Sequence, residues 1–158
     1  MVRWGAHTEA QRMDGDGAME SSHRGTEAQR GKGMTDNEIS RDVLDAAFKI
    51  HAAFGPGLLE SVYEALLAVE LEKRGHKVER QKWISFKYEG VDMENAFRVD
   101  LLVDDQVVVE LKSTEQMHPV FMKQVKTYLV IMKLHLGLVV NFGLATIKEG
   151  FVRVVNGY

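Results

Sequence analysis

The chain of 158 residues contains no cysteine. Disulfide bridges, zinc ribbons, iron–sulfur clusters and cysteine nucleophiles are therefore excluded, because each needs thiol or thiolate sulfur. The sequence also lacks a run of about 18 apolar residues that would span a membrane, and its N-terminal stretch lacks the apolar core of a secretory signal peptide. These absences predict a cytoplasmic protein without a membrane segment.

Neither sign of charge is in large excess. Twenty basic side chains stand against 23 acidic ones, which gives a formal net charge of −3. A protein that coats nucleic acid non-specifically carries a strong positive balance, so this chain does not belong to that class. Hydrophobic residues make up 45% of the chain, which supplies one domain with a single core but not two.

Large apolar side chains are scarce in residues 1–33. Such a segment cannot bury enough surface to offset its ordering entropy, so we expect a disordered leader. The sequence TEAQR at 8–12 recurs at 26–30. The leader is either a flexible tail that contacts a partner or, as we favour, read-through of upstream sequence with native translation starting at Met34. The folded domain is predicted over 34–158.

The predicted domain opens with a helix. Thr35 followed by Glu38 fits a capping box, and apolar residues then recur at helical spacing. The helix is expected to stop at the Gly-Pro-Gly sequence of residues 55–57, where Gly57 can take backbone angles closed to other residues. Two further helices are predicted over 58–74 and 120–134.

Alternating apolar residues bounded by turn signals predict the strands. These lie at 77–80, 83–88, 99–103, 107–112, 138–142 and 151–155. The order is helix, helix, three or four strands, helix and strand, with a last extended segment. That order indicates an α/β sandwich.

The second predicted helix carries an acidic residue on its apolar side. At about 100° per residue, its apolar residues form one broad sector, namely Leu58, Leu59, Val62, Leu66 and Val69, extended by Tyr63, Leu67 and Leu71. Glu60 falls inside this sector, whereas Glu64 and Glu72 fall on the polar side. A core-facing carboxylate is costly unless a cation or hydrogen-bond donor meets it. The favourable dipole at a helix N-terminus is a competing explanation for Glu60.

The sequence VDLLVDDQVVVELKS, residues 99–113, predicts two strands joined by a tight acidic turn. If the turn comprises residues 104–106, Asp100 lies opposite Glu110. Directly opposed residues share a face of the sheet, as do residues two apart on one strand, so Lys112 joins the same group. A two-residue turn would instead place Asp100 opposite a valine and scatter the group.

Clustering of these three side chains would have a chemical consequence. The adjacent carboxylates of Asp100 and Glu110 repel each other unless a proton or a divalent cation lies between them. Oxygen ligands of this kind suit Mg²⁺ or Mn²⁺. Lys112 is then placed to orient a water or to stabilise charge on a phosphate. The spacing D…ExK alone also arises by chance in many chains.

Longer sequence blocks give the pattern more specificity. Asp100 followed by Glu110-Leu111-Lys112 on an apolar strand resembles the signature of the PD-(D/E)XK nuclease superfamily. The sequence GLLESVY at 57–63 resembles the motif that names the GxxExxY protein family, a branch of this superfamily. The sequence GLVVNFG at 137–143 resembles the closing strand of that branch. The resemblance covers residues 36–155.

The resemblance implies a restriction-endonuclease-like αβββαβ core with a mixed central sheet flanked by helices. It also implies a metal-dependent hydrolase that cleaves phosphodiester bonds in DNA, with RNA left open. By this similarity Glu60, Asp100 and Glu110 are ligands of Mg²⁺ or Mn²⁺, and Lys112 is the catalytic lysine. The superfamily's PD dipeptide is Val99-Asp100 here, which removes nothing chemical.

The 120–134 helix adds two residues to the implied site. Gln124 and Tyr128 resemble the QxxxY motif of RecB-type members, and their spacing puts them on one helical face. The resemblance assigns Gln124 to the catalytic group, and Tyr128 and Tyr63 to substrate positioning. The competing explanation for the pair is an amphipathic helix whose tyrosine packs and whose glutamine is solvated.

Two functions remain open from the sequence. The first is the nuclease, and the second is a catalytically silent module that keeps the nuclease fold and binds nucleic acid or protein. The mild negative charge favours a nuclease of low affinity, or one that needs a homodimer or a partner protein to hold its substrate. Basic residues flank the predicted strands and could hold phosphates or simply be solvated. They include Lys73, Arg74, Lys77, Arg80, Lys82, Lys123, Lys126 and Lys133.

Overall fold

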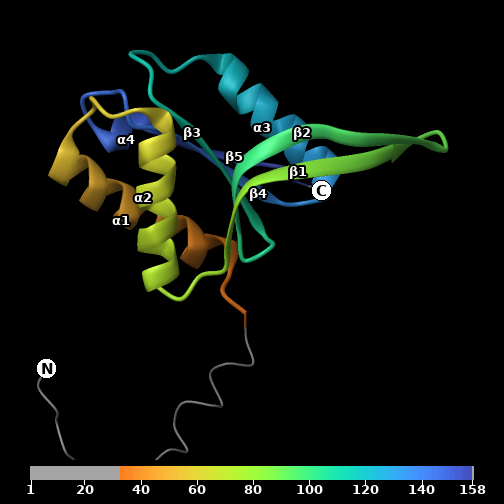
Figure 1. Cartoon of the computed structure of the whole chain (residues 1–158), viewed down its shortest axis with the longest axis horizontal. Coiled ribbons are helices and arrows are strands. Elements are labelled where there is room, and N and C mark those ends of the chain that lie inside the picture. Colours follow the sequence, from red (N-terminus) through yellow and green to blue (C-terminus); the bar gives the residue numbers. More distant parts are fainter. Residues whose placement is uncertain (1–32, 158) are drawn as a thin grey trace, which may run out of the picture. The chain divides into compact units, whose positions relative to one another are not determined.

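The computed structural model describes residues 33–157 of the chain (Figure 1). The predicted leader, residues 1–33, lies outside this range except for Gly33. The start of the domain at Met34 therefore stays a prediction. Among the described residues, no helix is long and apolar enough to cross a membrane.

Helix α1, Asp36–Phe54, begins at the predicted capping box. The backbone N–H of Glu38 donates to the Thr35 hydroxyl at 3.3 Å, and the Thr35 N–H donates to the Glu38 carboxylate at 2.7 Å. The helix ends at Gly55, whose φ of 69° is open to glycine at little cost. The prediction placed this role at Gly57, which is wrong, because the chain reverses at the first glycine of the Gly-Pro-Gly sequence.

Helix α2, Glu60–Lys73, buries only part of the predicted apolar sector, namely Tyr63, Leu67 and Leu71. Leu59, Val62 and Val69 are 73%, 39% and 45% exposed, although the sequence assigned them to the apolar sector. The buried residues of the helix are Tyr63, Glu64, Leu67, Ala68 and Leu71. Apolar residues are spread around α2, so its packing partners, not its own pattern, select the buried face.

Five strands form one mixed sheet in the order β1-β2-β3-β4-β5. Their bounds are Val78–Tyr88, Val91–Val103, Val107–Lys112, Leu136–Asn141 and Phe151–Val155. Strands β3 and β4 are parallel, and the other neighbouring pairs are antiparallel. Helix α3, Pro119–Met132, connects the parallel pair, as a crossover connection must. The short helix α4, Ile147–Gly150, was not predicted.

The sheet separates two apolar clusters. Val107 and Val109 of β3 pack into a cluster with α1 and α2, whereas Val108 packs with Leu129 of α3 on the other face. This alternation is the pleat of a strand buried on both sides. The predicted fold class, α/β with a mixed central sheet flanked by helices, is therefore confirmed.

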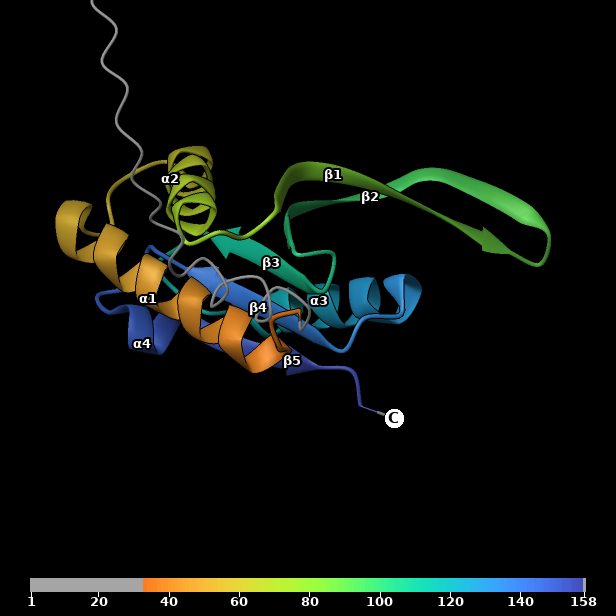
Figure 2. The same cartoon turned by 90° about the horizontal axis from the view of Figure 1, so that it is seen from below.

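The hairpin of β1 and β2 extends well beyond the rest of the sheet. Figures 1 and 2 both show the two strands leaving the other three as a long ribbon. Its tip is the predicted turn at Glu89 and Gly90, both of which have positive φ. The sequence predicted separate strands at 77–80 and 83–88, whereas β1 is one continuous strand. Within it, Gln81 has a φ of 49°, and the pairing with β2 shifts register between Ile84 and Phe86.

His76 connects helix α1 to the β2–β3 turn. Its side chain is 0% exposed, with Nδ1 2.6 Å from the Asp104 carboxylate and Nε2 2.9 Å from the Asp42 carboxylate. Burial alone would lower the pKa of this imidazole, but the hydrogen bonds to Asp104 and Asp42 outweigh burial, and the pKa is raised. The histidine is therefore stabilised in its charged form.

We expect the contribution of His76 to stability to depend on pH. Because its folded-state pKa lies above the unfolded value, the stabilisation is complete below about pH 6.5 and is lost as pH rises through the folded pKa. Replacing His76 with Gln should cost about 3 kcal/mol at pH 6 and less at pH 9. Thermal melts of both proteins across this range measure the difference. A difference that does not change with pH would contradict this account.

Candidate active site

The β2–β3 turn sets the register that the site requires. Val103 pairs with Val107, so the turn consists of residues 104–106, as predicted. Because a three-residue turn keeps the hairpin in this register, Asp100 and Glu110 are the next residues along the two strands after the last paired positions. The alternative register, which would have placed Asp100 opposite a valine, is excluded.

Asp100 lies where β2 separates from β3. The regular pairing of the two strands ends at Leu101 and Val109. Immediately beyond, the backbone N–H of Leu111 donates to Asp100 Oδ2 at 2.9 Å. A side-chain carboxylate thus replaces the strand carbonyl that a continuous ladder would offer. The β1–β2 hairpin diverges from the rest of the sheet here (Figure 2). We call the place beside Asp100 and Glu110, where the β2–β3 pairing ends, the fork.

The pleat of β2 also changes phase at this point. Val99 and Leu102, three residues apart, pack into the same apolar cluster, whereas Leu101 and Val103 pack into the cluster on the other face. A regular strand would place residues three apart on opposite faces. The irregularity lies next to Asp100, whose carboxylate accepts hydrogen bonds from Leu111 of β3 and from Gln81 of β1.

Glu110 is the acid of the site with a strongly raised pKa. The residue is 5% exposed, and its Oε1 lies 3.7 Å from Lys112 Nζ. Among the described residues, its Oε2 is the one buried side-chain polar atom without a hydrogen-bond partner. Burial raises the pKa of Glu110 to about 8, with the charge of Asp100 adding to the shift and the ammonium of Lys112 opposing it. An ionised Glu110 therefore needs a further positive group.

Lys112 ends strand β3 and faces helix α3. Its ammonium donates to Gln124 Oε1 at 3.4 Å and lies 4.8 Å from the centre of the Phe121 ring. The side chain is 16% exposed, so its charge is shielded from bulk water on most sides. These contacts direct the ammonium along the same face as Glu110.

Gln124 and Tyr128 lie on one face of α3, as their spacing predicted. Gln124 Nε2 donates to the Tyr128 hydroxyl at 2.6 Å, and the Tyr128 ring stacks on Phe97 with 4.2 Å between centroids. Burial raises the pKa of Tyr128, and the charge of Glu110 adds to it, so the phenol stays protonated. The tyrosine thus orients the glutamine, which in turn holds Lys112. The tyrosine packs, as the competing explanation expected, but the glutamine is hydrogen-bonded within the protein and not solvated.

Glu60 begins helix α2 and is exposed, not core-facing as predicted. It is the first residue of the helix, and its position in the helical sector does not bury it. Partial desolvation raises the pKa of its carboxyl, the charge of Asp100 adds to this, and Lys112 opposes it. Such mutual effects require short separations. Glu60 therefore lies near enough to Asp100 and Lys112 for their charges to act on its carboxyl.

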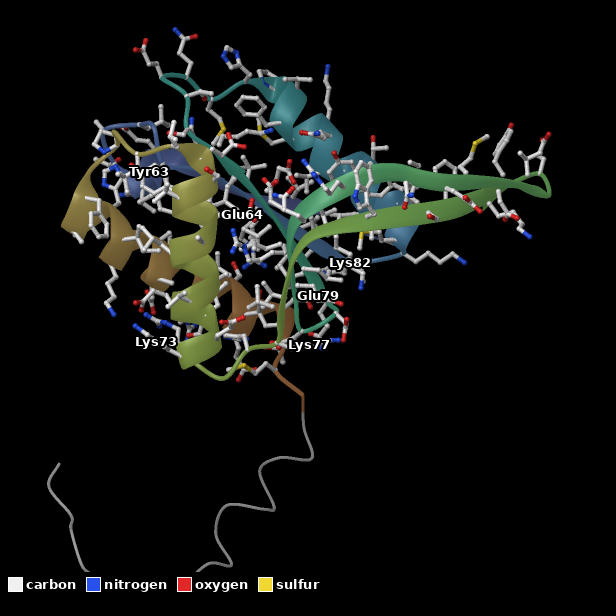
Figure 3. All side chains as sticks on the ribbon, viewed as in Figure 1. Tyr63, Glu64, Lys73, Lys77, Glu79 and Lys82 are labelled. Carbon is white, nitrogen blue, oxygen red and sulfur yellow. The ribbon has the colours of Figure 1, made fainter. Side chains whose placement is uncertain are left out.

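Glu64 belongs to the same region, although the sequence placed it on the polar side of its helix. It is 4% exposed, and Arg80 Nε donates to its carboxylate at 3.1 Å. Gln81 Nε2 also donates to Glu64, and to Asp100 Oδ1 at 3.2 Å. Figure 3 shows Glu64 between α2 and the strands. Its spacing of four residues from Glu60 is a signal that could have revealed it.

Tyr63 has a structural position, not a substrate-facing one. It is fully buried, its ring stacks on Phe142 with 4.3 Å between centroids, and its hydroxyl donates to the Gly55 carbonyl. The Leu58 N–H donates back to the hydroxyl at 3.0 Å. A side chain enclosed in this way cannot touch a substrate, so the predicted positioning role is corrected. Tyr63 instead holds the turn that precedes α2.

The oxygen atoms of the acidic residues suit a hard divalent cation, but these residues do not form a complete coordination site. In residues 33–157, no three carboxylate or imidazole side chains converge closely enough to hold a metal ion as they stand. The two oxygens of Asp100 each accept one hydrogen bond, from the Leu111 N–H and from Gln81 Nε2, and each oxygen keeps a further lone pair that a cation could use. The free Oε2 of Glu110 is an oxygen that a cation would satisfy. The chemistry of these oxygen donors therefore fits a hard divalent cation.

Most of the basic residues of β1 and the preceding loop are paired with acids. Lys77 lies 2.9 Å from Asp105, and Lys82 lies 2.6 Å from Glu79. Figure 3 shows Lys77, Glu79 and Lys82 along this edge. Pairing of this kind reduces the positive field available to a phosphate backbone.

A family model described as the PD-(D/E)XK nuclease superfamily matches residues 37–154. The match contains every strand of the sheet up to Val154 and all the residues that converge at the fork. Neither the curated proteins nor the solved structures gave a significant match.

Proposed function

The chain belongs to the PD-(D/E)XK nuclease superfamily, and on this premise we propose that it is a divalent-metal-dependent nuclease that hydrolyses phosphodiester bonds in DNA. One observation carries the proposal. Asp100, Glu110 and Lys112 meet at the fork of β2 and β3, where Glu110 has a buried oxygen without a hydrogen bond. A carboxylate pair can hold a divalent metal, and an adjacent ammonium can stabilise the charge that develops when a phosphodiester is hydrolysed.

We assign the roles from these contacts. Asp100, Glu110 and Glu60 would hold a Mg²⁺ or Mn²⁺ ion, which would act as a Lewis acid and lower the pKa of a bound water. Lys112 donates hydrogen bonds to the attacking water or to a phosphate oxygen. Gln124 keeps the ammonium in place, since its own amide is held by Tyr128.

The finer parts of the proposal rest on the sequence. The GLLESVY and GLVVNFG blocks support membership of the GxxExxY branch of the superfamily. A net charge of −3 and the pairing of basic residues along β1 support a dimer or a partner protein as the means of holding DNA. The absence of cysteine supports a cytoplasmic location.

A cleavage assay tests the proposed function. The protein is incubated with single-stranded and double-stranded DNA and with RNA, in Mg²⁺, in Mn²⁺ and in excess chelator. Cleavage of DNA that needs the metal supports the proposal, and cleavage of RNA alone would change the substrate. The Asp100→Ala protein, purified in parallel, detects a contaminating nuclease. Absence of cleavage on every substrate with either metal would favour the silent binding module.

A further inference from the structure

Gln81 has an unfavourable backbone conformation inside a strand. Its φ is 49°, a left-handed value that crowds the Cβ of any residue other than glycine. Its neighbours remain paired, Arg80 with Leu101 and Lys82 with Val99, so the strand continues on both sides. A single strained residue within a continuous strand needs a compensating interaction, and such residues concentrate at functional sites.

The compensation is the placement of the Gln81 amide. Its Nε2 donates one hydrogen bond to Glu64 and another to Asp100 Oδ1, at 3.2 Å for the latter. Both protons of the amide are therefore used on carboxylates. Glu64 is anchored independently, because Arg80 Nε donates to it at 3.1 Å. The amide thus links a fixed carboxylate on α2 to the carboxylate at the fork.

Asp100 is oriented by this link. Its Oδ2 accepts from the Leu111 N–H at 2.9 Å, and its Oδ1 accepts from Gln81. Two donors on two oxygens determine the plane of the carboxylate. Without the amide, Glu64 and Asp100 would present like charges to each other, and Asp100 would rotate away.

We propose that Gln81 is a positioning residue, whose left-handed backbone aims its amide so that Asp100 faces Glu110 correctly for metal binding. This inference rests on the proposed function, and it adds residues of β1 and α2 to the machinery of the fork. Donors that orient a ligand carboxylate commonly affect metal affinity by about 10- to 100-fold when removed.

Two variants and a matched control test the inference. Gln81→Gly tolerates the left-handed φ but removes the amide, and Gln81→Asn keeps the amide but is one methylene too short. Asn95→Gly is the control, because Asn95 has a φ of 50° on the hairpin and its backbone N–H bond to Ser85 survives the change. The readout is Mn²⁺ binding, followed by the electron paramagnetic resonance signal of free Mn²⁺, with melting curves in chelator.

We expect both Gln81 variants to melt cooperatively and to bind Mn²⁺ at least about 10-fold more weakly than wild type. Asn95→Gly should bind like wild type. Wild-type Mn²⁺ affinity in a folded Gln81→Gly or Gln81→Asn protein would overturn the inference. If Asp100→Asn also bound Mn²⁺ as wild type does, the proposed metal site itself would be wrong, so the two failures are distinguishable.

Discussion

Replacing Lys112 with Met is expected to leave a folded, metal-binding protein whose cleavage rate falls by about 10²- to 10⁴-fold. Methionine keeps much of the apolar stem but removes the ammonium that lies 3.7 Å from Glu110 and 3.4 Å from Gln124. If the ammonium acts on water or phosphate, chemistry is lost while the metal ligands remain. Single-turnover cleavage and Mn²⁺ titration of the same preparation measure the two quantities separately.

Lys126→Met is the matched control for this variant. Lys126 lies on the same helix as Gln124, and its ammonium donates to the Val155 carbonyl at 2.9 Å, away from the carboxylates. Its removal should leave the cleavage rate within about twofold of wild type. If Lys112→Met instead cleaved normally and only melted at a lower temperature, Lys112 would serve to neutralise Glu110. The assignment of Lys112 as the catalytic lysine would then be wrong, and the catalytically silent module would become the favoured hypothesis.

Replacing Glu110 with Gln should abolish most of the thermal stabilisation that Mn²⁺ gives to the wild-type protein. A ligand that binds only the folded state stabilises it by about 2.7 kcal/mol at a concentration of 100 Kd, which raises the melting temperature by several degrees. Glu110 contributes the one described buried oxygen that has no protein partner. Its loss therefore removes a ligand without breaking a hydrogen bond to that atom. Melting curves across a Mn²⁺ titration measure the effect.

The same variant should be more stable than wild type in chelator at pH 8.5. The folded-state pKa of Glu110 is raised to about 8, above the unfolded value, because burial disfavours the charge. Folding is therefore favoured by the protonated acid, and stability falls as pH rises from about 4.5 to about 8, by a few kcal/mol in order of magnitude. Because glutamine does not ionise, the Glu110→Gln protein does not lose stability in this way.

Glu115→Gln is the control for both measurements, since Glu115 is an exposed acid in the loop after β3. It should keep the Mn²⁺ shift and show no gain at pH 8.5. An equal Mn²⁺ shift in wild type and Glu110→Gln would mean that the ion binds elsewhere on the protein.

Local patterns predicted the elements that depend on neighbours in sequence. The capping box of Thr35 and Glu38 forms because both partners lie within one helical turn. The three-residue turn fixes which residues of the 99–113 hairpin oppose each other. Gln124 and Tyr128 meet because residues four apart on a helix are neighbours. In each case the geometry follows from a few adjacent backbone torsions.

Predictions failed where an element's environment decides the outcome. The apolar residues of α2 are spread around the helix, and contact with other elements buries Glu64 while leaving Leu59 exposed. Glu60 shares the helical position of buried residues but is the first residue of α2 and is exposed. Tyr63 belongs to the motif that suggested a substrate role, yet Phe142 and the turn before α2 enclose it.

The sequence by itself determined the chemical groups of the fork and the spacing of Asp100, Glu110 and Lys112, because strand periodicity and turn length are local properties. Only the tertiary structure decided that Glu64 and Gln81 join them. Three features bring them together. The pairing of β2 with β3 ends beside Asp100, Gln81 of β1 takes a left-handed backbone conformation, and Glu64 of α2 accepts hydrogen bonds from β1. No segment of the chain encodes that arrangement alone, because it results from packing among elements distant in sequence.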